Sequence, residues 1–145
     1  MGLIKIWTDG ACRGNPGVGG WGVYICGDNW DVKLYGYGGV TTNNEMELTA
    51  AVKALTHVEL YYGQRELELL SDSNYVITGM NTWIENWKKK GWKTTKGAVK
   101  NLELWKELDR LSKIHKITWT WVKGHSTDEG NIEADRLANL GADKC

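Results

Sequence analysis

Four acidic residues stand at positions where a carboxylate could do chemistry. Asp9 ends a strand-forming apolar stretch just before a glycine-rich segment, and Asp72 ends another such stretch. Glu47 lies on the apolar stripe of an expected helix, where a carboxylate is costly to bury unless it is paired or bound. Asp135 falls in the first turns of the last expected helix. Taken singly, each acid also has a simpler role in a turn, a helix cap or a helix dipole.

These four acids would form a site if the fold brought them together. Converging carboxylates repel one another, and some stay protonated at neutral pH without a cation. Hard divalent ions such as Mg²⁺ prefer carboxylate and water oxygens. Two such ions, about 4 Å apart, can activate water and stabilise the leaving oxygen in phosphodiester cleavage. We therefore predict a metal-dependent site, with the convergence itself inferred from the expected topology.

His125 is the histidine best placed for proton transfer near such a site. It stands in a polar loop before the last helix, and its neighbours Gly124 and Ser126 favour a flexible loop. A loop histidine with no chemical role is an equally simple explanation. His57 and His115 are expected to be solvated residues of a helix face or a loop.

Residues 83–100 interleave tryptophan with lysine. The segment holds six lysines and one acid, so it carries a net charge of +5 in a chain whose formal net charge is zero. The neutral total therefore hides a strong charge asymmetry. Lysines attract backbone phosphates and indoles stack on sugars or bases, which favours binding of a nucleic-acid strand. The alternative is a solvated charged helix with a few buried aromatic residues.

Length and composition are typical of one soluble domain over residues 1–145. The chain has 41% hydrophobic and 25% charged residues, which are ordinary values for a globular protein. No apolar run approaches the roughly 20 residues that span a bilayer, and no secretory signal is recognisable. The three cysteines show no metal-ligand spacing, and we interpret them as reduced thiols of a cytoplasmic protein.

Alternating apolar residues and turn residues predict five strands, over 3–10, 21–26, 31–39, 66–71 and 116–122. A glycine-rich bend over 11–20 separates the first two, and short turns favour an antiparallel meander of the first three. Capping signals predict helices from Thr42 to about Val58, after Ser73, through the basic segment, from Asn101 and from Asn131.

This order of elements predicts an α/β fold with a five-stranded mixed sheet flanked by helices. Strands one, four and five would be parallel through helical crossovers, and strands one to three antiparallel. Ligands gather at one end of such parallel strands, where Asp9 and Asp72 are expected.

Five motifs, in the same order over nearly the whole chain, resemble type HI ribonuclease H. They are Thr8-Asp9-Gly10 with Gly14-Asn15-Pro16-Gly17, Thr42-Asn43-Asn44-Glu45-Met46-Glu47-Leu48, Ser71-Asp72-Ser73, Trp83 to Lys93, and Val122-Lys123-Gly124-His125. The resemblance implies a ribonuclease H-like fold and an endonuclease that cuts the RNA strand of RNA–DNA hybrids, leaving 5′-phosphate and 3′-hydroxyl ends. It also implies Mg²⁺, or Mn²⁺ as a substitute, with two ions bound when substrate is present.

The resemblance further implies a role for each residue that matches a family motif. Asp9, Glu47, Asp72 and Asp135 match the metal-binding catalytic carboxylates, and His125 matches a histidine that assists proton transfer or product release. The positions that match nucleic-acid contacts are Cys12, Arg13, Gly14, Asn15 and Asn44 for RNA, Thr42, Asn43 and Asn101 for a DNA phosphate, Tyr75, Trp83 and Thr95 for the DNA strand, and Lys88, Lys89, Lys90 and Trp92 in the basic protrusion.

The sequence departs from the family pattern at a few positions. Thr127 replaces a glycine and Ile132 an acid after the histidine, and Val40 stands where some members have an arginine. No hybrid-binding module precedes the first strand, so we expect binding by the catalytic domain alone, as a monomer without a membrane partner.

Two other functions share much of this sequence evidence. One is a non-catalytic hybrid-binding module, which the intact set of four acids argues against. The other is a related nuclease of the same fold that acts on DNA, which the basic tryptophan-rich segment argues against.

Overall fold

A computed structural model describes residues 2–124 and 127–144. Its main sheet has the strand order β3-β2-β1-β4-β7. The strands are β1 (Ile4–Arg13), β2 (Gly17–Cys26), β3 (Asp31–Thr41), β4 (Glu66–Ser71) and β7 (Lys116–Trp121). The strands β1, β2 and β3 pair antiparallel, whereas β4 pairs parallel with β1 and with β7. The predicted five-stranded mixed sheet is therefore confirmed.

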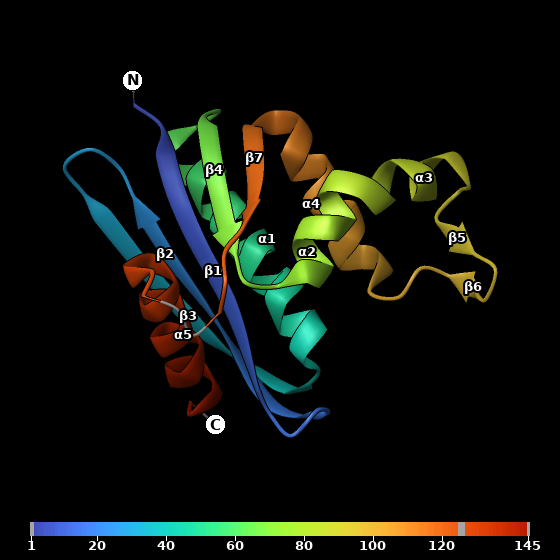
Figure 1. The fold of residues 1–145 in the computed structure, drawn as a ribbon, viewed down its shortest axis with the longest axis horizontal. Coiled ribbons are helices and arrows are strands. Elements are labelled where there is room, and N and C mark those ends of the chain that lie inside the picture. The colour runs from blue at the N-terminus through green and yellow to red at the C-terminus, as the bar shows by residue number, and fades with distance from the viewer. Residues whose placement is uncertain (1, 125–126, 145) are drawn as a thin grey trace.

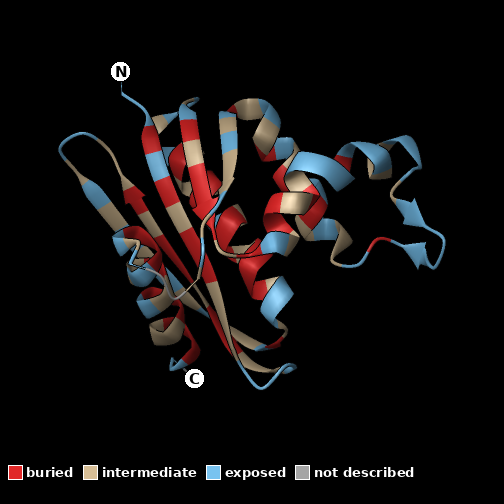
Figure 2. Ribbon diagram, viewed as in Figure 1, coloured by how far each residue is buried: buried red, intermediate tan, exposed pale blue. Residues whose placement is uncertain are grey.

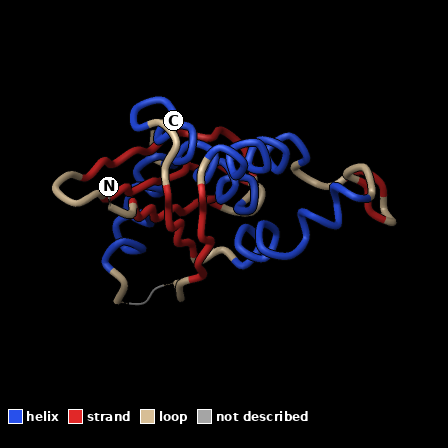
Figure 3. The backbone as a smooth tube through the Cα atoms, turned by 90° about the horizontal axis from the view of Figure 1, so that it is seen from above, coloured by secondary structure: helices blue, strands red, loops and turns tan. Residues whose placement is uncertain are grey.

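Helices cover both faces of this sheet (Figures 1 and 3). On one face α1 (Asn43–Tyr62) packs against β1 and β2 and is itself contacted by α4 (Leu102–Ile114). On the other face α5 (Glu129–Ala142) lies over β1, β2 and β3. Buried residues line the strands and the inner faces of the helices (Figure 2). They include the bulky side chain of Trp105.

Glycines let α5 lie very close to the sheet. A Cβ atom added at Gly22 would overlap the carbonyl oxygen of Ala134, and one added at Gly20 would overlap the backbone at Ala142. Because a side chain at either position would push the helix away, these glycines set the distance between α5 and β2. That distance matters because α5 carries Asp135.

The predicted bend over residues 11–20 is wrong. The strand β1 continues to Arg13 and β2 already begins at Gly17, so only a short turn separates them. Glycine content was the misleading signal, since ladder hydrogen bonds join backbone groups and do not need side chains. Gly14 adopts a φ of 77° in this turn, a conformation that favours glycine.

Two helix boundaries and one predicted cap also differ from the prediction. The helix α1 runs past Val58 to Tyr62, and α5 begins at Glu129 with the Asp128 side chain capping it, rather than at Asn131. Asn101 precedes α4 as predicted, but its side chain makes no cap and its φ is 56°. Its amide instead donates to the Tyr75 hydroxyl.

The basic segment forms a projecting unit at one end of the molecule (Figure 1). It comprises α3 (Ile84–Lys89) and a small hairpin of β5 (Lys93–Thr94) and β6 (Gly97–Ala98). The helices α2 (Asn74–Thr78) and η1 (Gly79–Trp83) connect it to β4. The hairpin was not predicted, because two-residue strands leave no alternating pattern. Within the part of the chain that the structure describes, no helix is long and apolar enough to cross a membrane.

Candidate active site

The candidate site lies where β1 and β4 part. The two strands pair as far as Thr8 and Ser71, after which β4 ends and β1 continues beside β2 alone. Asp9 and Asp72 directly follow these last paired residues. The first turns of α1 reach the place where the two strands separate. They bring Glu47, from a helix on one face of the sheet, close to the two aspartates.

Three of the predicted carboxylates converge as expected. Asp9, Glu47 and Asp72 each offer an oxygen atom, and these atoms lie within 4.8 Å of one another. Asp135 joins them from α5, and all four acids line one cavity of about 380 Å³. A hydrogen bond with Asp135 and its charge both raise the pKa of Asp9. The convergence that the topology predicted is therefore present, and Asp9 interacts with each of the other three acids.

Burial and mutual repulsion hold protons on two of these acids. The pKa of Asp9, which is 4% exposed, is raised to about 9, first by burial and then by Asp72 and Asp135. The pKa of Glu47, which is 7% exposed, is raised well above its usual range by burial and by the charges of Asp9 and Asp72. Such a cluster carries its full negative charge at neutral pH only when a cation is bound.

The residues present fit a hard divalent cation. Oε1 of Glu47 is buried and has no hydrogen-bond partner among the described residues. An unsatisfied buried carboxylate oxygen is costly, and a cation would satisfy it. All the donors are carboxylates, the ligand type that Mg²⁺ and Mn²⁺ prefer.

Several residues that the sequence did not indicate support these acids. The backbone N–H of Gly10 donates to Asp9 Oδ1 over 3.0 Å. Asp72 is contacted twice, by Asn131 Nδ2 at its Oδ2 (3.4 Å) and by the Trp121 indole N–H at its carbonyl oxygen (3.2 Å). Asn139 Nδ2 reaches both the backbone and the carboxylate of Asp135.

Helix spacing alone could have pointed to Asn139, which stands four residues after Asp135. Asn131 and Trp121 reach Asp72 only through the tertiary fold. Asn74 also lines the cavity without having been predicted.

Two glycines make room at the site. A Cβ atom on Gly10 would lie 2.6 Å from the backbone nitrogen of Glu47, so glycine allows β1 and α1 to meet there. A Cβ atom on Gly124 would lie 2.9 Å from Asp72 Oδ2. The backbone after β7 therefore passes directly beside a carboxylate of the site.

A second cavity adjoins the acidic one. It has a volume of about 360 Å³, and Asn44 and Tyr75 line both cavities. Its other lining residues are Asn15, Thr42, Glu45, Lys100 and Asn101. Most of these are positions that the resemblance assigns to RNA or to a DNA phosphate, so the structure brings them together. Asn43 is exposed beside them, and its backbone N–H donates to Asn15 Oδ1 over 3.0 Å.

Aromatic rings connect the second cavity to the basic segment. Tyr75 contacts Trp83 and Trp105, and Trp87 contacts the same two tryptophans, with ring centroids 5.1–6.0 Å apart. Trp105 is fully buried, whereas Trp83 is 37% exposed. The cluster thus anchors the projecting unit to the core and exposes one indole.

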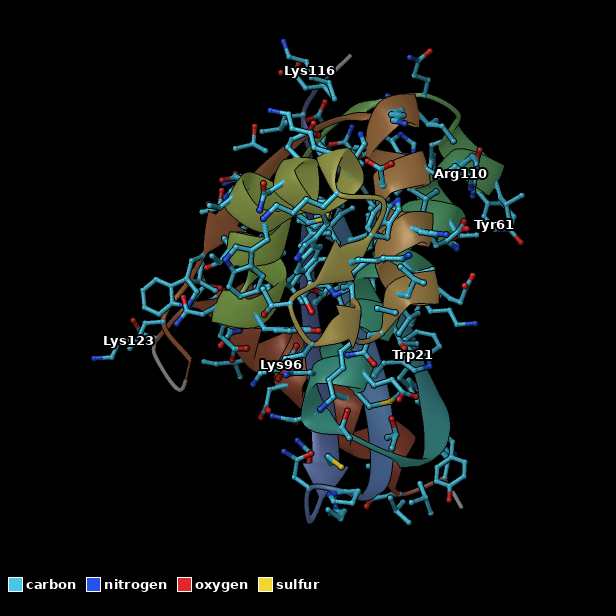
Figure 4. The ribbon with its side chains drawn as sticks, turned by 90° about the vertical axis from the view of Figure 1, so that its right-hand side faces the viewer. Trp21, Tyr61, Lys96, Arg110, Lys116 and Lys123 are labelled. Atoms are coloured by element: carbon cyan, nitrogen blue, oxygen red, sulfur yellow. The ribbon has the colours of Figure 1, made fainter. Side chains whose placement is uncertain are left out.

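The lysines of the basic segment are not equivalent. Lys88 lies 3.1 Å from Asp109 and 3.5 Å from Glu85, and its pKa is raised by these acids. Lys89 and Lys90 are exposed on the same helix end. On the hairpin side of the unit, Thr95 and Lys96 are exposed and Trp92 is half-buried; Figure 4 shows Lys96 on the side that faces the viewer.

The remaining predicted residues have mixed outcomes. Cys12 is half-buried with its Sγ near the carbonyl oxygens of Gly14 and Thr41, and Arg13 is engaged by α5. His125 lies outside the described residues. The expectation for His115 is wrong: it is 4% exposed at the end of α4, where Nδ1 accepts the Arg65 N–H and burial lowers its pKa.

A buried acidic cluster at the ends of parallel strands defines the chain as a candidate metal-dependent nuclease. The chain belongs to the ribonuclease H family, since the RNase H family model matches residues 2–143. The ribonuclease H of Ruthia magnifica subsp. Calyptogena magnifica is 55% identical over 145 residues, which cover 99% of this chain and 98% of that protein. The ribonuclease HI of Pseudomonas putida is 48% identical over 142 residues, covering 97% and 94%.

Solved structures agree with this family. LC9-RNase H1, described as a type 1 RNase H with the type 2 active-site motif, superposes with a TM-score of 0.87 at 30% identity, covering 97% of this chain and 72% of that one. LC11-RNase H1, solved in complex with an RNA/DNA hybrid, gives a TM-score of 0.75 at 26% identity and covers 97% of both chains. The predicted ribonuclease H fold and enzyme class are confirmed.

Proposed function

We propose that this protein is an endonuclease that hydrolyses the RNA strand of RNA–DNA hybrids with the help of divalent cations held by Asp9, Glu47, Asp72 and Asp135. The observation that carries the proposal is the buried acidic cluster at the parting of β1 and β4, in which Glu47 Oε1 has no partner among the described residues. The hybrid bound by the related LC11-RNase H1 supports the choice of substrate.

Each acid has a part in holding the cations. Asp9 interacts with each of the other three acids, so it would be the central residue in holding divalent cations. When bound, such ions activate a water molecule for attack on phosphorus and stabilise the leaving oxygen. The Gly10 N–H fixes the rotation of the Asp9 carboxylate, and His125 is the proposed group for proton transfer or product release.

The surface around the cavity suggests how a hybrid binds. The RNA strand crosses the acidic cavity, where Asn44 lies within reach of the 2′-hydroxyls of that strand. The DNA strand follows the second cavity, where Lys100 offers a charge for a phosphate, and continues over Trp83 toward the basic segment. Since only a hybrid offers both strands, duplex RNA and duplex DNA would be poor substrates.

Finer features of the activity are part of the same proposal. The products carry 5′-phosphate and 3′-hydroxyl ends, the ions are two Mg²⁺ ions with substrate bound, and Mn²⁺ substitutes for them. We further propose that residues 1–145 act as a single catalytic domain, as a monomer in the cytoplasm.

Replacing Asp9 by Asn tests the assignment of the acids. We expect cleavage of a labelled hybrid to fall at least about a hundredfold, since a charged group at the reacting centre is lost. Hybrid affinity, measured without turnover in chelator, should stay within about twofold. Glu66→Gln, which removes an exposed acid at the end of β4 opposite Asp72, is the matched control. Near-normal turnover of the Asp9 variant at saturating Mg²⁺ would refute the proposed roles.

A further inference from the structure

A hydrogen-bonded chain joins the tip of the β1–β2 hairpin to Asp135. Arg13, the last residue of β1, donates from Nη1 to Asn139 Oδ1 over 2.6 Å and from Nη2 to Asp143 Oδ1 over 2.6 Å. Asn139 Nδ2 lies 2.9 Å from the carbonyl oxygen of Asp135 and 3.4 Å from its Oδ1. An exposed arginine is thereby connected to one of the four acids of the site.

Regular spacing on two packed elements produces this chain. Asp135, Asn139 and Asp143 follow one another at intervals of four residues, so they line one face of α5. Asp9 and Arg13 lie on one face of β1, because side chains two and four residues apart share a face of a strand. Asp9 meets Asp135, and Arg13 meets Asn139, as two successive contacts between β1 and α5.

The guanidinium of Arg13 determines how the Asn139 amide is oriented. A guanidinium can only donate hydrogen bonds, so the amide oxygen must face Arg13 and the NH₂ group must face Asp135. With Arg13 removed, only the Asp135 carbonyl and carboxylate oxygens hold the amide in this orientation, so the amide is less firmly fixed.

We propose that Asn139 is a positioning residue for Asp135 and that Arg13 locks Asn139 in the orientation that supports divalent-cation binding. This inference rests on the proposed function. By holding Asp135 Oδ1, the Asn139 amide limits the rotation of the carboxylate and leaves its other oxygen for a cation. Arg13 therefore serves the site through Asn139, and not through the RNA contact that the resemblance implies.

The exposure of the Arg13 and Asp143 side chains distinguishes a role in cation binding from a role in folding stability. The side chains of Arg13 and Asp143 are 45% and 65% exposed, and ion pairs this exposed contribute little to folding stability. Removing the chain of hydrogen bonds should therefore weaken cation binding while leaving the thermal stability of the metal-free protein nearly unchanged.

Two variants and a matched control test the inference on the full chain. Asn139→Leu removes the amide at similar size in a helix-compatible side chain, and Arg13→Ala removes the lock. Arg110→Ala is the control, because Arg110 is a similarly exposed arginine on α4, paired with Glu107 on the same helix and with Glu59 on α1, away from the site. The measurements are Mg²⁺ or Mn²⁺ affinity by calorimetry without substrate, the Mg²⁺ midpoint of hybrid cleavage, hybrid affinity in chelator, and the melting temperature.

We expect Asn139→Leu to weaken cation binding and raise the Mg²⁺ midpoint about tenfold, as for other residues that orient metal ligands. Arg13→Ala should shift both in the same direction, and the double variant should match Asn139→Leu alone, because Arg13 acts through Asn139. Hybrid affinity should stay within about twofold of the unsubstituted protein, and Arg110→Ala should change nothing.

Two results would overturn the inference. One is unchanged cation affinity in both variants. The other is an Arg13→Ala variant that loses hybrid affinity with an unchanged Mg²⁺ midpoint, which would make Arg13 a direct RNA contact. Absence of hybrid cleavage by the unsubstituted protein would instead refute the proposed function, and the calorimetric comparison would still decide the role of Asn139. If Asn139→Leu does not fold, the exposed Arg13→Ala variant alone decides it.

Discussion

At the scale of single residues, the site depends on acids that the fold holds in an unfavourable state. Asp9 and Glu47 are buried beside other acids, so each is protonated well above the pH at which a free carboxyl loses its proton. Cation binding and proton release are therefore coupled, as they are wherever a ligand must be deprotonated to bind a metal.

This coupling predicts how metal-free stability depends on pH. Asp9 has a pKa of about 9 in the fold against an ordinary value of 3.8, so between these values the folded state binds more protons than the unfolded state. The folding stability contributed by protonated Asp9 is complete below the pKa of the unfolded state and is lost as pH rises toward 9. In chelator, the melting temperature should fall from pH 7 to pH 9, by up to about 3 °C per pH unit. Asp9→Asn should flatten this slope, and saturating Mg²⁺ should stabilise the unsubstituted protein more at pH 9 than at pH 7.

The effect of Asp9 and the effect of the buried histidine on stability fall in different pH ranges. Burial lowers the pKa of His115, so its contribution is present above the unfolded value near 6.5 and is lost as pH falls below it. Melting curves above pH 7 therefore report mainly on the acids. Parallel slopes for the Asp9→Asn variant and the unsubstituted protein would contradict the account of Asp9.

At the scale of elements, secondary structure was predicted most accurately where a single local sequence pattern determines it. Alternation of apolar residues identified the strands, and the S/T-x-x-E box located the start of α1, where Thr42 Oγ1 accepts the Glu45 N–H. Prediction failed where backbone hydrogen bonding overrode composition, as in the glycine-rich start of β2. It also failed where a side chain found a tertiary partner, as Asn101 did in Tyr75.

The helix α3 gives a prediction that separates binding lysines from a structural one. Lys88 is held by Asp109 and Glu85, whereas Lys89 and Lys90 are exposed. Replacing Lys89 and Lys90 by Ala should lower hybrid affinity and reduce the salt dependence of binding by about two counterions. Lys88→Ala is the matched control and should leave that slope nearly unchanged. Equal slopes for all three proteins would mean that these lysines only solvate the surface.

At the scale of the whole molecule, the chain separates negative and positive charge. The acids gather at the parting of β1 and β4, and the lysines gather on the unit that projects beyond the sheet (Figure 1). The sequence already indicated this separation through the net charge of +5 over residues 83–100. The meeting of the acids was predictable from topology, because Asp9 and Asp72 directly follow the last paired residues of adjacent parallel strands. The contacts of Asn131 and Asn139 needed the three-dimensional arrangement of α5 against the sheet.

The most direct test of the account is cleavage of three duplexes of one sequence, RNA–DNA, RNA–RNA and DNA–DNA, each end-labelled on either strand. With Mg²⁺, we expect cuts only in the RNA strand of the hybrid, and none when a chelator replaces the metal. Equal cleavage of the duplex DNA, or hybrid cleavage that persists in chelator, would contradict the account.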